Sequence, residues 1–111
     1  MALNRIEHDL RFAETLIQLG DNYEAYLVLK GIPTRVKSSR FRRNNPKLYG
    51  QYHFFYCKVN LSLGVGNFQF MPYLERANKA FYESGEYQML LSSLDSQRVY
   101  NRQKNENEIV V

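Results

Sequence analysis

The stretch Gly20-Asp21-Asn22-Tyr23-Glu24-Ala25, with Leu29 four residues further on, decides the fold. It predicts a tight turn between two amphipathic helices, with a small residue where they cross. Gly20 suits the end of the first helix because glycine takes a positive φ without a Cβ penalty. The first helix is expected from about residue 3 to 19, because its apolar residues recur at gaps of three and four: Leu3, Ile6, Leu10, Ala13 and Ile17.

Beyond the turn, the sequence predicts four more segments. A short helix covers about residues 23–30, and a basic, polar loop with room for one helical turn covers 34–45. A third helix runs from Pro46 to about Leu63, because Asn45 is a typical N-cap and proline is favoured at the first helical position. The turn Gly64-Val65-Gly66-Asn67 closes this helix.

The last part of the chain predicts two further helices. One begins between Phe68 and Met71 and ends at Gly85. The other covers about residues 86–100, with Tyr87, Leu90, Leu91 and Leu94 facing inward. Together these segments predict an all-α protein of about five helices in antiparallel hairpins. We expect one domain over 1–103 and a flexible, polar tail over 104–111.

Composition narrows the class of protein. The chain has 111 residues, of which 44% are hydrophobic, too many for a disordered chain. Its single cysteine, Cys57, excludes an intrachain disulfide and fits a reducing compartment. Acidic residues close to the N-terminus argue against a signal peptide, and polar residues interrupt the apolar stretch 48–74, so we expect no membrane span. A cytoplasmic location follows from these expectations.

Basic residues are concentrated in one segment. The net charge is +4, yet residues 34–47 hold six basic residues and no acidic one: Arg35, Lys37, Arg40, Arg42, Arg43 and Lys47. One interpretation is that Arg40, Arg42 and Arg43 attract an acidic protein partner. A second is that all six, with Phe41 stacking on a base, bind nucleic acid. A third is a solvated or internally paired loop, and the sequence leaves all three open.

Large apolar and aromatic residues surround the predicted helix 46–63 on nearly all sides. Either this helix is central, or one of its faces meets a partner. For the second case the candidate residues are Tyr52, Phe55 and Tyr56, with Tyr73 from the next helix, because tyrosine is typical of interfaces. A second copy of the chain is the simplest partner, so we expect a homo-oligomer.

His53 and Cys57 stand four residues apart and could share a helix face. A nucleophile–base pair also needs an orienting group, and no acidic residue lies between Glu24 and Glu75 to serve locally. Two ligands also fall short of a structural zinc site. We therefore interpret Cys57 as a small buried thiol, and expect no catalytic residue, no metal site and no cofactor.

Two sets of residues resemble tetratricopeptide repeats. Ala13, Gly20 and Ala25 match the small residue of the first repeat helix, the glycine before the second helix and the alanine five residues on, while the usual aromatic is displaced to Tyr23. Residues 49–87 are similar to a further repeat pair, with the tyrosine-rich segment 52–56, Phe68, and the run 73–77 (Tyr-Leu-Glu-Arg-Ala). This second match resembles the repeats of Rap and arbitrium-type peptide-signal receptors of Gram-positive bacteria and their phages.

The resemblance implies tetratricopeptide-like hairpins and a role in binding proteins or peptides, as a regulator or inhibitor of bacterial or phage origin. Residues 33–46 interrupt the repeat, so two or three hairpins are expected rather than a full solenoid groove. No phosphatase residue of that family can be matched in this chain. The sequence therefore predicts a non-enzymatic binding module, with nucleic-acid binding through the basic segment as the alternative.

Overall fold

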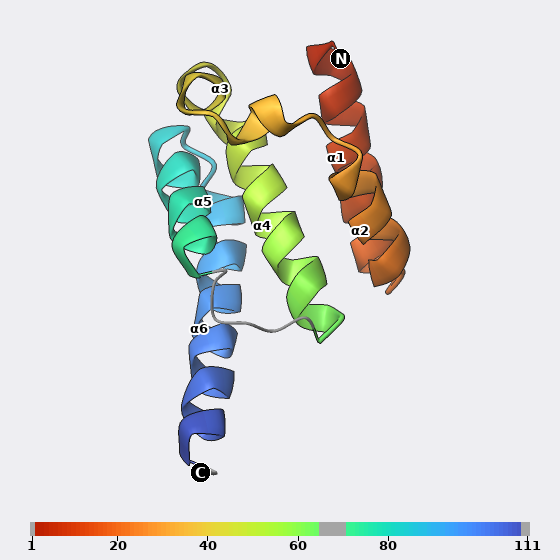
Figure 1. The fold of residues 1–111 in the computed structure, drawn as a ribbon. Helices are drawn as coiled ribbons and strands as arrows, with labels where there is room; N and C mark the ends of the chain where they lie inside the picture. Colours follow the sequence, from red (N-terminus) through yellow and green to blue (C-terminus); the bar gives the residue numbers. More distant parts are fainter. Residues whose placement is uncertain (1, 65–70, 110–111) are drawn as a thin grey trace.

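The computed structural model describes residues 2–64 and 71–109, with side chains described as far as Arg102 (Figure 1). Every regular element in these ranges is a helix, so the predicted all-α class is confirmed for this part of the chain. In chain order the elements are α1 (Leu3–Gln18), α2 (Asn22–Lys30), the 3₁₀ helix η1 (Thr34–Lys37), α3 (Ser39–Asn44), α4 (Pro46–Ser62), α5 (Met71–Glu83) and α6 (Tyr87–Ile109).

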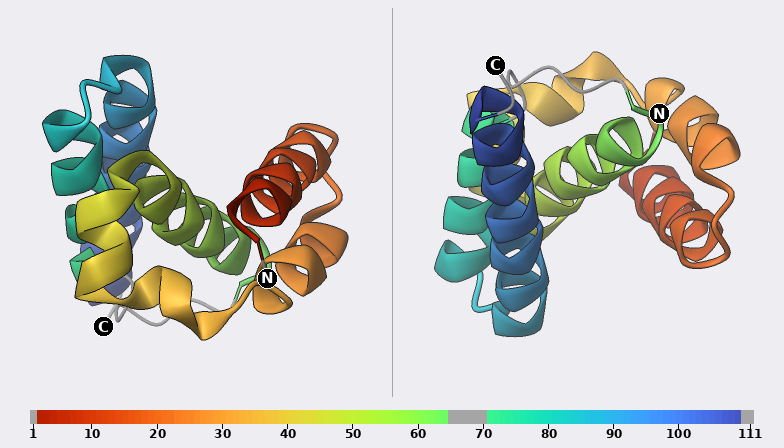
Figure 2. Two further views of the ribbon diagram at one scale, coloured as in Figure 1. Left: turned by 90° about the horizontal axis from the view of Figure 1, so that it is seen from above. Right: turned by 90° about the horizontal axis from the view of Figure 1, so that it is seen from below.

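Helix α4 runs through the middle of the molecule. The α1–α2 pair lies on one side of it and the α5–α6 pair on the other (Figures 1 and 2). Helices α1 and α2 are joined at Gly20 and helices α5 and α6 at Gly85, with φ of 84° and 73° respectively, which only glycine adopts cheaply. The likeness of these pairs to tetratricopeptide hairpins stays a resemblance.

The core forms around α4 because neighbouring helices send apolar residues toward it. Ile6 and Leu10 of α1, Leu29 of α2 and Phe81 of α5 are almost completely buried. Small residues also lie at these contacts, since Ala13, Ala25, Ala77 and Ala80 have no exposed surface. An alanine at a helix contact lets the two backbones approach closely, which explains how such short helices enclose a core.

The segment 34–45, predicted as a loop with room for one helical turn, is more helical than expected because it contains both η1 and α3. Ser38 caps the start of α3, since its Oγ accepts a hydrogen bond from the Phe41 N–H at 3.0 Å. Val36 and Phe41 are buried and hold the segment against α4. These two apolar residues anchor a segment whose other side chains are mostly polar.

Helix α6 differs from the prediction in length and in orientation. It continues to Ile109, whereas the sequence pattern ended it near Tyr100. Leu90 is half-buried, but Tyr87, Leu91 and Leu94 are exposed, so the prediction that these three face inward is wrong. The reason is that α6 packs against α5 with only one of its two apolar faces.

Several sequence predictions concern residues outside the described ranges. Most of the predicted turn at residues 64–67 lies outside the described residues, because the description stops at Gly64. Phe68, one of the residues that match the repeat pattern, also lies outside them. The predicted start of the fourth helix lay between Phe68 and Met71, and α5 is described from Met71 onward. The flexibility of the tail 104–111 stays a prediction.

Candidate interaction surface

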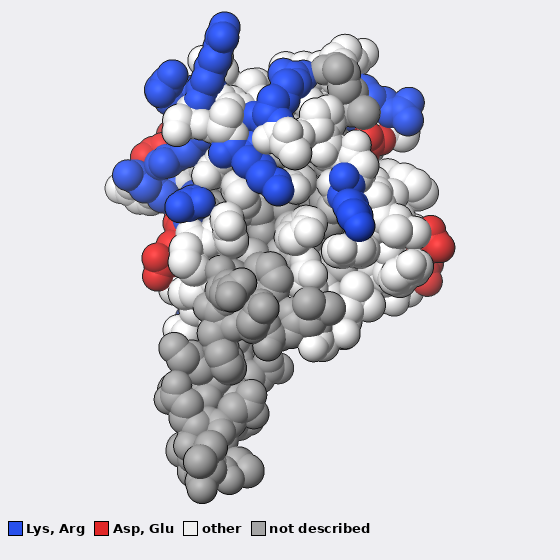
Figure 3. All heavy atoms as spheres, viewed as in Figure 1, with Lys and Arg blue, Asp and Glu red and all other residues white. Residues whose placement is uncertain are grey.

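The six basic residues of segment 34–47, here called the basic surface, cover η1, α3 and the start of α4: Arg35, Lys37, Arg40, Arg42, Arg43 and Lys47. Figure 3 shows this concentration of positive charge over the upper part of the molecule. Val36 and Phe41 point into the core, so their basic neighbours are turned toward solvent. The same two anchors therefore fix the fold of the segment and present its charges.

Two members of the basic surface are paired with acidic residues near the α5–α6 turn. An amino nitrogen of Arg42 lies 3.4 Å from Glu83 Oε1, and Lys47 Nζ lies 3.6 Å from Glu86 Oε1. These pairs tie the start of α4 and the end of α3 to the turn between α5 and α6. They are partly exposed and so contribute little to stability, about 0–1 kcal/mol each.

Other members of the basic surface lie over aromatic rings. The Arg35 guanidinium is 5.8 Å from the centre of the Phe41 ring, and Lys37 Nζ is 5.9 Å from that of Tyr52. Arg40 and Arg43 differ from these residues and from the paired Arg42 and Lys47. Neither forms an ion pair or a cation–π contact with any residue that the structure describes. Both are exposed, so these two guanidinium groups are available to an external carboxylate or phosphate.

Helix α3 has an open hollow on each side. One, of about 450 Å³, is lined by Arg35, Ser38, Arg40, Phe41, Asn44 and Asn45. The other, of about 500 Å³, is lined by Ser39, Arg42, Arg43, Pro46 and Glu83. Guanidinium, amide and hydroxyl groups together offer many donors for oxygen acceptors. Each hollow has the chemistry to receive carboxylate side chains of an extended or helical segment.

An exposed aromatic residue comes directly before Glu83, which lines the second hollow. This residue, Tyr82, is 67% exposed, and its ring lies 6.4 Å from that of Tyr87 across the turn, measured between centroids. Sequence reasoning did not single out Tyr82. The signal that could have found it is the near-symmetrical run of residues 82–87, Tyr-Glu-Ser-Gly-Glu-Tyr, which places a tyrosine on each side of the glycine turn.

The predicted aromatic surface on α4 is not brought together as an exposed face. Tyr52 and Phe55 are each only 4% exposed and belong to the core, which corrects their assignment to a partner surface. Tyr56 is half-buried and stacks on Tyr52 at 5.8 Å, while Tyr73 on α5 is exposed and stacks on His53. The physical reason is the central position of α4, which α1, α2, η1, α3 and α5 all contact.

Phe41 is likewise buried, which corrects its proposed role in stacking on a base. The arginines of the nucleic-acid interpretation remain exposed or half-exposed, but their aromatic partner faces the core. A stacking platform for single-stranded nucleic acid would have to come from elsewhere on the surface.

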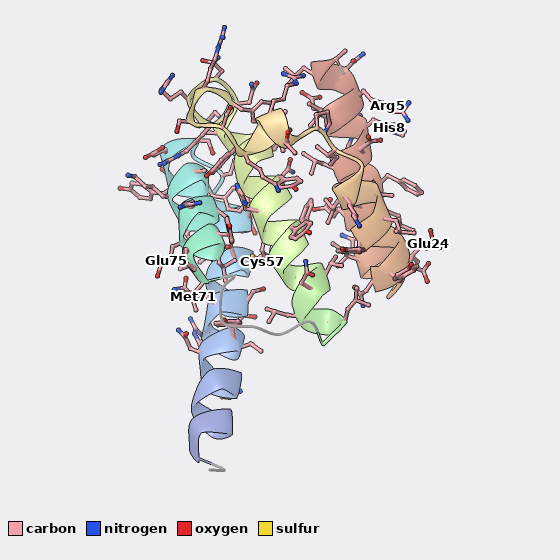
Figure 4. The ribbon with its side chains drawn as sticks, in the orientation of Figure 1. Arg5, His8, Glu24, Cys57, Met71 and Glu75 are labelled. Carbon is pink, nitrogen blue, oxygen red and sulfur yellow. The ribbon has the colours of Figure 1, made fainter. Side chains whose placement is uncertain are left out.

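His53 and Cys57 are both in the interior, and Figure 4 shows Cys57 between α4 and α6. Burial raises the pKa of the Cys57 thiol to about 12, so the thiol stays protonated near neutral pH. Burial, with smaller contributions from Arg76 and Lys37, lowers the pKa of His53 to about 4. Both side chains are buried, with His53 4% and Cys57 2% exposed, so neither group lies on the surface of the described structure.

Within residues 2–64 and 71–109, no group of three or more His, Cys, Asp or Glu side chains is placed to hold a metal ion. No described helix combines the length and the apolar character needed to cross a membrane.

A comparison of this chain with models of protein families, with curated proteins and with solved structures finds no match in any of the three. The resemblance to tetratricopeptide repeats therefore remains one of spacing and residue type.

Proposed function

We propose that this protein is a binding module that captures an acidic segment of another protein on its basic surface. The observation that carries the proposal is the pair of open hollows on either side of α3, with Arg40 lining one and Arg43 the other. Arginine and tyrosine are among the residue types that contribute most at protein interfaces, and the exposed Tyr82 comes directly before Glu83, a lining residue of the second hollow. A regulatory role would follow from occupancy of this surface.

The charge pattern favours a protein over a nucleic acid. Glu83 lies 3.4 Å from Arg42, and Glu86 lies 3.6 Å from Lys47. These two acidic residues divide the positive charge of the basic surface into separate parts. A partner with a few spaced carboxylates can avoid these two acids, whereas a continuous phosphate backbone meets them. The burial of Phe41 removes the ring that would have stacked on a base.

Selection from a display library of short random peptides against the immobilised protein tests this proposal. The enriched peptides should carry Asp or Glu next to an aromatic or aliphatic residue. Arg40→Ala/Arg43→Ala should weaken binding of a selected peptide by about thirtyfold to several hundredfold, since each arginine at such a site contributes about 1–2 kcal/mol. Fluorescence anisotropy with the labelled peptide measures this change.

A matched control makes the same change of charge elsewhere. Arg5→Ala/Lys30→Ala alters α1 and α2, and Arg5 lies on the outer side of that pair, away from α4 (Figure 4). This variant should bind the peptide as the original protein does. If the selected peptides lack acidic residues, or if an oligothymidine strand binds more tightly with a slope of about 0.7 per phosphate in a salt titration, the protein-partner proposal is wrong.

A further inference from the structure

Helix α6 carries a second apolar seam on the face that is turned away from α5. Its members are Tyr87, Leu91 and Leu94, which are 60%, 64% and 39% exposed, followed by the exposed Arg98. The gaps between them are four, three and four residues, the spacing of one seam of a helix pair. The opposite face holds the buried Ser93 and Tyr100 and the half-buried Met89.

The order of these gaps makes the seam self-complementary in an antiparallel arrangement. A spacing of four, three and four reads the same in both directions, so a second α6 running the opposite way presents an identical pattern. Leu91 of one copy then faces Leu94 of the other, twice, at the centre. Tyr87 of one copy faces Arg98 of the other at each end of the seam.

Chemistry also selects the antiparallel direction. An arginine that packs against a tyrosine ring gains a cation–π contact of about 0.5–2 kcal/mol. A parallel pair would instead place Arg98 against Arg98, and like charges at a contact are unfavourable. No ion pair joins Arg98 to another described residue, so its guanidinium is available for the partner's ring.

We infer that two copies of this chain associate through α6, antiparallel, with Leu91 against Leu94 and Tyr87 against Arg98. The interface is isologous, as in most homodimers, because each contact occurs twice about the two-fold axis. The seam from Tyr87 to Arg98 is about 16 Å long at 1.5 Å per residue. Because the contact is this short, the dimer should be weak and should dissociate on dilution.

Sedimentation equilibrium of the full chain over a wide concentration range tests the association. We expect a monomer at low concentration and a dimer at high concentration. Leu91→Ser/Leu94→Ser should raise the dissociation constant at least about tenfold without loss of helical circular dichroism, because both side chains are exposed in the monomer. The matched control, Leu19→Ser/Leu27→Ser, removes two exposed leucines from the α1–α2 region and should leave the dimer unchanged.

Cysteine cross-linking tests the direction and register independently. In a Cys57→Ala background, oxidation of a mixture of Leu91→Cys and Leu94→Cys chains should yield the mixed disulfide dimer. Either chain alone should cross-link much more slowly, since the antiparallel register does not bring equal positions together. A protein that stays monomeric at all concentrations, a control variant that loses the dimer, or preferential cross-linking of Leu91→Cys with itself would overturn the inference. None of these results bears on peptide binding at the basic surface.

Discussion

Phe81→Ala is expected to lower the free energy of unfolding by about 3–5 kcal/mol, which is a large part of the stability of a domain this small. Phe81 has no exposed surface, and its ring meets that of Phe54 edge-on at a centroid distance of 6.2 Å. Removing the ring leaves a cavity between α4 and α5, which the surrounding helices can fill only in part. Urea denaturation followed by circular dichroism measures the loss. Phe12→Ala, at a half-exposed position on α1, is the control and should cost less than about 1 kcal/mol.

The same ring explains the presence of glycine in the second turn of α4. A Cβ added at Gly50 would lie 2.6 Å from Phe81 Cε1 and 2.8 Å from Cδ1, closer than a side-chain atom can approach. Gly50→Ala should therefore destabilise the protein by about 1–3 kcal/mol, although alanine alone favours a helix by about 1 kcal/mol. In the Phe81→Ala background the clash is absent and Gly50→Ala should become neutral or stabilising. Additive effects of the two substitutions would contradict the close approach of α4 to α5 at this point.

The sequence was sufficient to predict the helices whose apolar residues follow one period. Pro46 and Asn45 located the start of α4, and Gly20 and Gly85 located the ends of α1 and α5. Helix α3 was missed because only Phe41 among its residues is apolar, and its stability comes from the Ser38 cap and from contact with α4. Both are tertiary or side-chain details that periodicity does not report.

The orientation of α6 was not predictable from periodicity either. Leu90 and Leu91 are neighbours in sequence and lie on different faces, so apolar residues mark both sides of the helix. The positions of α5 and α4 in the fold decide which side is covered. The same limit applies to α4, where Tyr52 and Phe55 were assigned to a surface because the sequence does not show that five elements contact this helix.

The candidate surface was predictable in charge and not in shape. Residues 34–47 contain six basic residues and no acidic one, so the sequence alone shows that this segment is positively charged, whatever its conformation. Its pairing with Glu83 and Glu86 depends on the α5–α6 turn lying beside the end of α3 and the start of α4, although Arg42 and Glu83 are 41 residues apart in sequence. These contacts are the reason that we propose a protein partner rather than a nucleic acid.

Acidification should destabilise the fold through His53. The ring is enclosed by Tyr49, Tyr52 and Tyr73 at centroid distances of 4.5, 5.4 and 5.5 Å, and its Nε2 is buried without a hydrogen-bond partner among the described residues. Burial, then Arg76 and Lys37, lowers its pKa from 6.5 to about 4. Protonation would therefore place a charge in an apolar environment close to two cations.

The direction of the effect follows from proton linkage. Because the pKa is lower in the folded state, the unfolded chain takes up the proton first, as the pH falls below about 6.5. The contribution of His53 to stability is complete above that pH and is lost progressively toward pH 4, reaching about 3 kcal/mol. Urea denaturation at a series of pH values between 7 and 5 should show about 2 kcal/mol of this loss before most carboxylates titrate.

Two variants separate this effect from other titrations. His53→Phe keeps an aromatic ring at the site and removes the titrating group, so its stability should change much less between pH 7 and pH 5 than that of the original protein. His8→Gln removes an exposed histidine and should leave the pH dependence as it was. Since both variants lose one histidine, a difference between them isolates burial as the cause. Equal pH dependence in the original protein and in His53→Phe would show that the imidazole is not enclosed by the three tyrosines as described.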